Sequence, residues 1–208
     1  MNPEYLKYVP VRRISHYSSG LACMISLLRT SSKSALTQQH LLERHESLLL
    51  KDIDSLNSFG HTSHASLSAI ALAHGFIHAD EVTETVSALY DNPLDISGGG
   101  LWLGLSEFLA NYAQGHKRAV FVAQPEVVQE DHDGNYNDGP PDVISEDRNG
   151  PLEWTRVTDV GTYSGVVRAT VMNPESGTLE RVDVTNITIR HLIALTPITL
   201  EWEFPVQR

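Results

Sequence analysis

Two potential nucleophiles lie close together near the start of the chain. Ser19 and Cys23 are one helical turn apart, so they share one side of the helix that the apolar spacing predicts over residues 19–29. His16 stands three residues before Ser19 and is the side chain best placed to act as a displaced general base. A serine needs such a base to attack a carbonyl at neutral pH. For Cys23 we favour the simpler interpretation of a small, buried apolar side chain.

Histidine pairs elsewhere are weaker candidates for metal binding. His61 and His64 are spaced i,i+3, and His74 and His78 are spaced i,i+4, which would place each pair on one face of a helix. Gly75, however, is predicted to end the helix between His74 and His78. We therefore favour surface or hydrogen-bonded histidines, and we expect neither a metal site nor a cofactor.

An acidic segment from Glu126 to Asp147 contains eight acids and no Lys or Arg. Its glycines and prolines predict a loop, inserted at about residues 125–150. Residues 131–142 place oxygen ligands at alternating positions, as calcium loops do, but the twelfth position holds Asp142 instead of the usual bidentate Glu. We favour a solvated acidic loop over a calcium site. A protein with a basic patch is a partner that such a loop would bind.

Composition narrows the class of protein. The 208 residues carry a formal net charge of −11, concentrated in that segment, which argues against binding to the phosphate backbone of a nucleic acid. The single cysteine excludes an intrachain disulfide and any zinc site with two or more cysteines. No apolar run is long enough for a membrane span, and the first residues lack the apolar core of a signal peptide. We expect a cytoplasmic globular protein that does not enter membranes.

The elements that must position these side chains change character along the chain. Helical periodicity dominates before the acidic segment, and strand-like runs dominate after it. We predict an α+β fold of one domain, residues 1–208, with a helical N-terminal half packed on an antiparallel C-terminal sheet. The expected helices are 19–29, 37–50, 64–74, 81–90 and 101–113, and the expected strands are 118–123, 152–160, 165–172, 179–184 and 193–204.

The segment from Tyr8 to Leu28 resembles the nucleophile region of the C39-like papain-fold peptidases, in particular their guanylyl-cyclase-like relatives. In that group a Val-Pro segment leads to a Gln, and Cys-Gly-Leu-Ala-Cys follows five residues later at the start of an apolar helix. Residues 20–23, Gly-Leu-Ala-Cys, match this motif. The resemblance implies a papain-like fold in which the second cysteine, here Cys23, is structural.

The resemblance also shows which catalytic positions have changed. The nucleophile position holds Ser19, and the position of the oxyanion-binding Gln holds Ile14. In the second half, the Val-Gly at 160–161 and the Asn-Pro at 173–174 align with the family pattern, which puts Thr155 at the position of the catalytic His. Asn173 keeps the residue that orients this His. Three of the four catalytic positions are therefore substituted.

Three hypotheses follow. The first is a non-catalytic pseudopeptidase that binds a peptide or protein partner in a papain-like cleft lined by Ile14, Ser19, Thr155 and Asn173. The second is a divergent acyl-transfer or amide-hydrolysing enzyme that uses Ser19, or Cys23, with His16 as its base. The third is a partner-binding subunit that uses the acidic loop. The oligomeric state is not predicted by the sequence.

Overall fold

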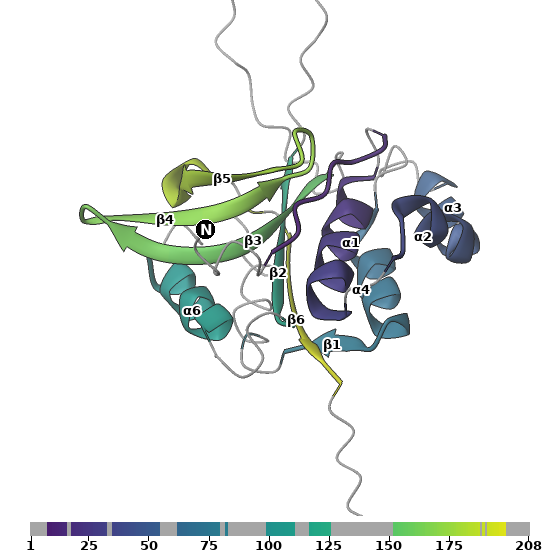
Figure 1. Ribbon diagram of the computed structural model, residues 1–208, viewed down its shortest axis with the longest axis horizontal. Coiled ribbons are helices and arrows are strands. Elements are labelled where there is room, and N and C mark those ends of the chain that lie inside the picture. The colour runs from purple at the N-terminus through teal and green to yellow at the C-terminus, as the bar shows by residue number, and fades with distance from the viewer. Residues whose placement is uncertain are drawn as a thin grey trace, which may run out of the picture.

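The computed structural model describes residues 8–15, 18–32, 35–54, 62–79, 82, 99–110, 117–125, 152–187, 189 and 191–198 of the chain. These residues form an antiparallel sheet of six strands with helices on both faces (Figure 1). In chain order the elements are α1 Ser19–Ser32, α2 Gln38–Arg44, α3 Glu46–Asp54, α4 His64–Ala73, β1 Phe76–His78, α6 Gly99–Ala110, β2 Ala119–Pro125, β3 Leu152–Tyr163, β4 Val166–Asn173, β5 Thr178–Asp183, a short 3₁₀ helix Val184–Asn186, and β6 His191–Pro197. The predicted α+β class, a mixture of helices and antiparallel sheet, is confirmed.

The sheet is not built from the second half of the chain alone. Its strands lie in the order β1-β6-β2-β3-β4-β5, and each neighbouring pair is antiparallel. The last strand, β6, inserts between β1 and β2, which both precede the acidic segment. The three residues of β1 were not predicted as a strand, because so short a run shows no recognisable alternation. The expected division into a helical half and a stranded half is therefore correct only for β3, β4, β5 and β6.

Alternation along the central strands separates two apolar cores. Phe121 and Ala123 of β2 face the side that carries α1 and α4, whereas Val120 and Val122 face the side that carries α6. Side chains of successive strand residues point to opposite faces, so one strand supplies both cores. Such a sheet needs cover on both faces, and the helices in Figure 1 provide it.

Helix α1 is buried along most of its length. Every residue from Ser18 to Leu28 is buried, because the helix contacts β3 of the sheet as well as α2 and α4. A helix that is apolar on most sides is expected in such a central position. The prediction of a helix over residues 19–29 is confirmed, and the structure extends the helix to Ser32.

The other helical predictions were correct in type but not always in extent. The predicted helix 37–50 is two helices, α2 and α3, which separate at His45. Thr37 caps α2 by accepting a hydrogen bond from the backbone N–H of His40. Helix α4 ends as predicted, because Gly75 follows it with a φ of 83°, a conformation that favours glycine.

Several predictions fall outside the described residues. They are the helix 81–90 apart from Val82, the acidic segment 126–147 with its calcium-like loop, the ends of the expected helix 101–113 and strand 193–204, and the base candidate His16. The prediction of a single domain spanning residues 1–208 is not tested and stays a prediction. Within the described residues, none of the helices is both long and apolar enough to cross a membrane.

Candidate functional site

The first turn of α1 is held by a buried serine that precedes it. Ser18 Oγ accepts hydrogen bonds from the backbone N–H groups of Ile14 and Ser15 at 3.1 and 3.0 Å, and it donates to the carbonyl of Ser15. Gln38 of α2 braces the same segment from the other side, because its Nε2 donates to the carbonyl oxygen of Arg12 at 2.6 Å. These bonds fix the backbone of residues 12–15, while the side chain of Ile14 stays 56% exposed.

Ser19, at the predicted nucleophile position, makes a structural contact. Its side chain is buried, with only 1% of the residue exposed. Its Oγ accepts a hydrogen bond of 3.0 Å from the backbone N–H of Trp154 in β3. The hydroxyl therefore fastens the beginning of α1 to the beginning of β3. A serine nucleophile instead needs access to a substrate and a base that takes its proton.

Gly20 allows the close approach behind this contact. A Cβ atom at position 20 would lie 3.0 Å from Cβ of Thr62 and 3.1 Å from Cδ1 of Trp154, which is tighter than ordinary van der Waals contact. Thr62 and Trp154 are themselves joined, because the indole Nε1 donates to the carbonyl of Thr62 at 2.6 Å. The Gly that matches the family motif thus has a packing role here.

The backbones of the four positions chosen from the resemblance lie near one another, but Thr155 faces the α6 side of the sheet, opposite to its neighbour Trp154. Ser19 touches Trp154, the neighbour of Thr155 in β3, and the register that pairs Arg156 with Met172 puts Asn173 on the adjacent strand. Ile14 joins them because the preceding residue, Arg13, donates its backbone N–H to the carbonyl of Pro174 at 2.7 Å.

The side chains at these positions are engaged in local structure. Asn173 organises the turn between β4 and β5, because its Oδ1 accepts from the backbone N–H of Glu175 at 2.8 Å and of Ser176 at 3.3 Å. Its Nδ2 donates to Glu180 Oε1 at 2.9 Å. Thr155 is buried within β3. These described hydrogen bonds connect Asn173 to Glu175, Ser176 and Glu180, and none of them orients a histidine.

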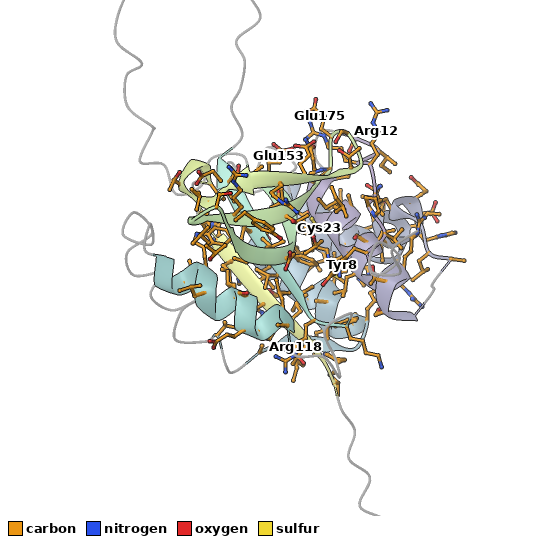
Figure 2. All side chains as sticks on the ribbon, turned by 60° about the vertical axis from the view of Figure 1, so that its left-hand side comes forward. Tyr8, Arg12, Cys23, Arg118, Glu153 and Glu175 are labelled. Atoms are coloured by element: carbon orange, nitrogen blue, oxygen red, sulfur yellow. The ribbon has the colours of Figure 1, made fainter. Side chains whose placement is uncertain are left out.

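Two arginines bind the segment of residues 12–15 to the sheet, next to the turn between β4 and β5. Arg12 Nε donates to the carbonyl of Glu175 at 2.9 Å, and Arg13 forms an ion pair of 3.2 Å with Glu153. Figure 2 shows Arg12, Glu153 and Glu175 gathered at one end of the molecule, with Cys23 and Tyr8 further along. The accessible surface here is made by residues 12–15 and by the β4–β5 turn.

Cys23 lies inside the apolar core, as predicted. The residue has no exposed surface, and burial raises the pKa of its thiol far above the ordinary value. The guanidinium of Arg156 opposes this pKa shift but does not cancel it. A nucleophilic cysteine instead needs a lowered pKa and access to solvent.

A buried arginine was missed by the sequence reasoning. Arg156 of β3 is 0% exposed, and its Nη1 donates to Ser26 Oγ at 2.8 Å and to Thr30 Oγ1 at 3.2 Å. Ser19, Cys23, Ser26 and Thr30 are small residues on the side of α1 that meets β3. Their spacing of 4, 3 and 4 residues is the signal that would have found this contact, because it repeats with the helical period.

A second group of titratable side chains adjoins Trp154. The ring of His64 lies 5.8 Å from the rings of both His78 and His191, and 6.5 Å from that of Trp154, between ring centroids. The pKa of His64 is lowered to about 4, first by burial and then by His191 and His78. Within the described residues, however, no group of three His, Cys, Asp or Glu side chains is arranged to hold a metal ion.

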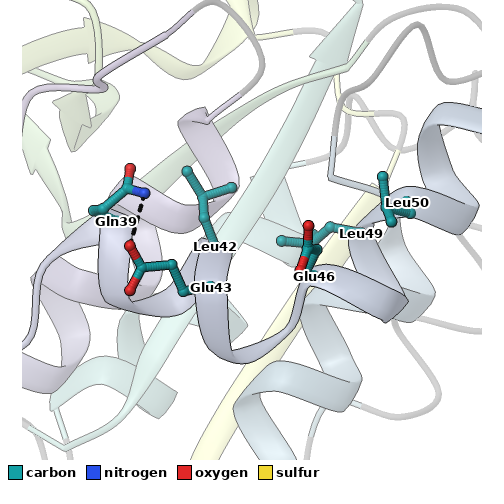
Figure 3. A pocket seen from close by; sticks show the side chains of 6 residues that line it. All are labelled: Gln39, Leu42, Glu43, Glu46, Leu49 and Leu50. Carbon is teal, nitrogen blue, oxygen red and sulfur yellow. Dashed lines mark hydrogen bonds between the residues drawn. The ribbon is translucent and has the colours of Figure 1, made fainter.

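A cavity of about 320 Å³ lies elsewhere, over α2 and α3 (Figure 3). Both acidic and apolar side chains line it, and Gln39 Nε2 donates to Glu43 Oε1 at 3.0 Å on its wall. None of the family positions belongs to its lining, which consists of Gln39, Leu42, Glu43, Glu46, Leu49 and Leu50.

Comparisons with protein-family models, with curated proteins and with solved structures found no match to this chain. The resemblance to the C39-like peptidases therefore stays a prediction that rests on the residues quoted from the sequence. His16, the expected base of the enzyme hypothesis, lies outside the described residues, so its distance from Ser19 is not defined.

Proposed function

We propose that this chain is a non-catalytic, C39-like protein that binds a peptide or protein segment beside the start of α1. The observation that carries the proposal is the contact of Ser19, whose buried Oγ accepts the N–H of Trp154. A hydroxyl in this position is neither accessible to a substrate nor paired with a described base. The arrangement supports retention of the scaffold without its nucleophile.

The other family positions support the same proposal. Ile14 carries no side-chain donor for an oxyanion, and one such donor is worth about 10²–10³ in rate. The amide of Asn173 is committed to the β4–β5 turn and to Glu180. Cys23, the alternative nucleophile, is buried, and its pKa is raised. No described contact favours the enzyme hypothesis, and the acidic loop of the third hypothesis lies outside the described residues.

The exposed surface around Ile14, next to the β4–β5 turn, is where a partner would bind. Ile14 is a large apolar side chain with more than half of its surface exposed, on a backbone fixed by Ser18 and Gln38. A rigid apolar side chain among polar neighbours is a common anchor for a bound segment. Arg12 and the turn at Glu175 lie beside it and supply polar groups at the rim.

Restoring the family nucleophile tests the absence of catalysis. In a Cys23→Ala background, Ser19→Cys would be the only thiol, and we expect iodoacetamide to alkylate it far more slowly in the folded protein than in urea. Ser176→Cys in the same background is the control, because its turn is exposed. Rapid alkylation of Ser19→Cys, or hydrolysis of a peptide ester by it, would contradict the proposal.

A peptide library tests the binding surface. Peptides displayed on phage would be selected on the wild-type chain and then measured against variants. We expect Ile14→Asp to weaken binding by at least about tenfold, because it places a charge at the anchor. Leu103→Asp is the matched control, since Leu103 is equally exposed (53%) but lies on α6. Peptides that bind Ile14→Asp as well as wild type would contradict this location.

A further inference from the structure

The cavity over α2 and α3 is lined by corresponding faces of the two helices. Each helix contributes three residues at the spacing i, i+3 and i+4, which lie on one side of a helix. The two sets are Gln39, Leu42 and Glu43 of α2 and Glu46, Leu49 and Leu50 of α3 (Figure 3). The helices separate at His45, and both faces border the one cavity of about 320 Å³.

The inner part of the cavity is apolar. Leu42 and Leu49 are half-buried and pack against the core that contains α1. Leu50 lies further out, with 47% of its surface exposed. The three leucines therefore offer apolar contact that is continuous with a packed core and accessible from outside. Such contact is what the apolar face of an amphipathic segment needs.

The acidic side chains of the cavity have no cationic partner. Glu43 accepts a hydrogen bond of 3.0 Å from the neutral amide of Gln39. Within the described residues, neither Glu43 nor Glu46 forms an ion pair, and the lining of the cavity contains no Lys or Arg. A second copy of the chain would bring more acid than base, because its formal net charge is −11. Charge complementarity therefore favours a basic partner.

The exposure of the lining favours a protein segment over a small molecule. Sites for small ligands bury roughly 70–90% of the surface of the ligand. Here Gln39, Glu43 and Glu46 are all exposed, so the cavity is open to solvent on its polar side. An amphipathic helix in a groove needs less enclosure, because it inserts a few apolar side chains and leaves its polar face in solvent.

We propose that the cavity between α2 and α3 binds a basic amphipathic helix of a partner protein. Apolar side chains of that helix contact the three leucines, and a Lys or Arg beside them pairs with Glu43 or Glu46. The proposal does not rest on the binding proposed at Ile14, because Ile14 does not line the cavity.

Selection from a peptide library finds segments that bind at this cavity. Short peptides displayed on phage would be selected on the full chain carrying Ile14→Asp, which disables the other proposed surface. Peptides that still bind after Glu43→Lys and Leu50→Asp are added to this chain would be discarded. We expect the remaining peptides to combine Lys or Arg with apolar residues at i, i+3 and i+4.

Affinities of the selected peptides then locate the contact. Fluorescence polarisation should show binding at least about tenfold weaker for Glu43→Lys and for Leu50→Asp than for wild type. Glu107→Lys and Leu103→Asp are the matched controls, because these residues are an exposed acid and an exposed leucine on α6, outside the cavity. Wild type and Ile14→Asp should bind equally, which separates this site from the surface at Ile14.

Four outcomes would overturn the proposal. Selection that enriches no peptide, or only peptides without a basic residue, would exclude the expected partner. Equal losses in the α6 controls would place the contact elsewhere. Binding that salt does not weaken would exclude a contact based on charge complementarity. If a second copy fills the cavity instead, sedimentation should show a wild-type dimer that Leu50→Asp converts to a monomer.

Discussion

Small hydroxyl residues of α1 contact β3 at both ends of this helix–strand contact, but the donors that they accept from differ in charge. At the beginning of α1, the hydroxyl of Ser19 accepts a backbone N–H, and Gly20 lets Trp154 and Thr62 pack closely. Two turns later, Ser26 and Thr30 accept from the charged Arg156. The first end is satisfied by neutral groups, whereas the second leaves half of a buried guanidinium without a partner.

This difference shows that a sequence motif and an unsatisfied buried group need not occur at the same place in the fold. The end that resembles a peptidase motif is a closed packing junction. The end that matches no motif carries the unsatisfied charge. A motif reports residue types at a spacing, and the same types can serve a helix–sheet contact. An unsatisfied buried polar edge is costly, so its presence calls for a partner or another compensation.

The largest expected effect comes from removing the side chain that closes the first end. Trp154→Ala should lower the free energy of unfolding by about 3–5 kcal/mol, because it opens a cavity among fully buried neighbours and frees the carbonyl of Thr62. Urea unfolding would measure it. Leu103→Ala, on an exposed position, should change the stability by less than about 0.5 kcal/mol. Similar values for both would mean that Trp154 does not close a packed junction.

A matched pair of hydroxyl deletions compares the two ends directly. Ser26→Ala removes an acceptor from a charged donor and should cost about 1.5–3 kcal/mol, whereas Ser19→Ala removes one from a neutral N–H and should cost about 0.5–1.5 kcal/mol. Both serines are buried at 1% exposure, so burial does not separate them. Equal losses in urea unfolding would break the distinction between a neutral end and a charged end.

Gly20→Ala tests the close approach at the first end. The added methyl would lie 3.0 Å from Cβ of Thr62 and 3.1 Å from Cδ1 of Trp154, closer than van der Waals contact, and such overpacking should cost about 1–3 kcal/mol. Gly104→Ala in α6 is the control, since its Cβ would meet nothing within 4 Å and alanine favours helices by up to about 1 kcal/mol. The two substitutions should therefore change the thermal midpoint in opposite directions. A shared direction would show that the structure relaxes around Gly20.

Acid should lower the free energy of unfolding through His64, which lies beside Trp154, but not through Arg156. The pKa of His64, beside Trp154, is lowered to about 4 by burial, so the unfolded chain binds its proton more readily than the folded chain. Stability is then full above the ordinary pKa of 6.5 and falls as the pH drops toward 4. Allowing for solvent screening of this partly exposed ring, the loss attributable to His64 is about 1–2 kcal/mol.

Unfolding at several pH values between 4 and 7 measures this dependence. His64→Gln should flatten the profile within that window only. Arg156 does not titrate there, because its lowered pKa is still about 10. A variant profile parallel to that of wild type would assign the pH dependence to other groups. The pKa values of His45, His74 and His78 are lowered as well, so they contribute to the remaining slope.

Local patterns predicted most of the described elements. Helical apolar spacing identified α1 and α4, and strand-like runs identified β2, β3, β4 and β5, because these elements are long enough to show a local pattern. The three residues of β1 and the break at His45 between α2 and α3 escaped. Both depend on contacts made elsewhere: β1 exists because β6 pairs with it, and β6 lies more than a hundred residues later in the chain.

For the candidate site, the sequence predicted the positions but not the present roles of their side chains. The sequence selected four positions, and the structure brings their backbones near one another but turns Thr155 to the opposite face of the sheet from Trp154; the positions are Ile14, Ser19, Thr155 and Asn173. Their present roles were not predictable, because a hydroxyl's role depends on what faces it. The partner of Ser19 is 135 residues away, and that of Ser26 is 130 residues away.

The sequence by itself determined the helix of α1, the small residues along one side of it and the strands that follow the acidic segment. Those features are local, and they follow from periodicity and from residue identity. Only the tertiary structure decided that Ser19 is buried and bonded to the backbone of Trp154, that Arg156 is buried with its Nε and Nη2 atoms unsatisfied, and that His64 lies among other rings. Burial and pairing are properties of groups that meet across the fold, and pairing energies depend on the low dielectric constant created there.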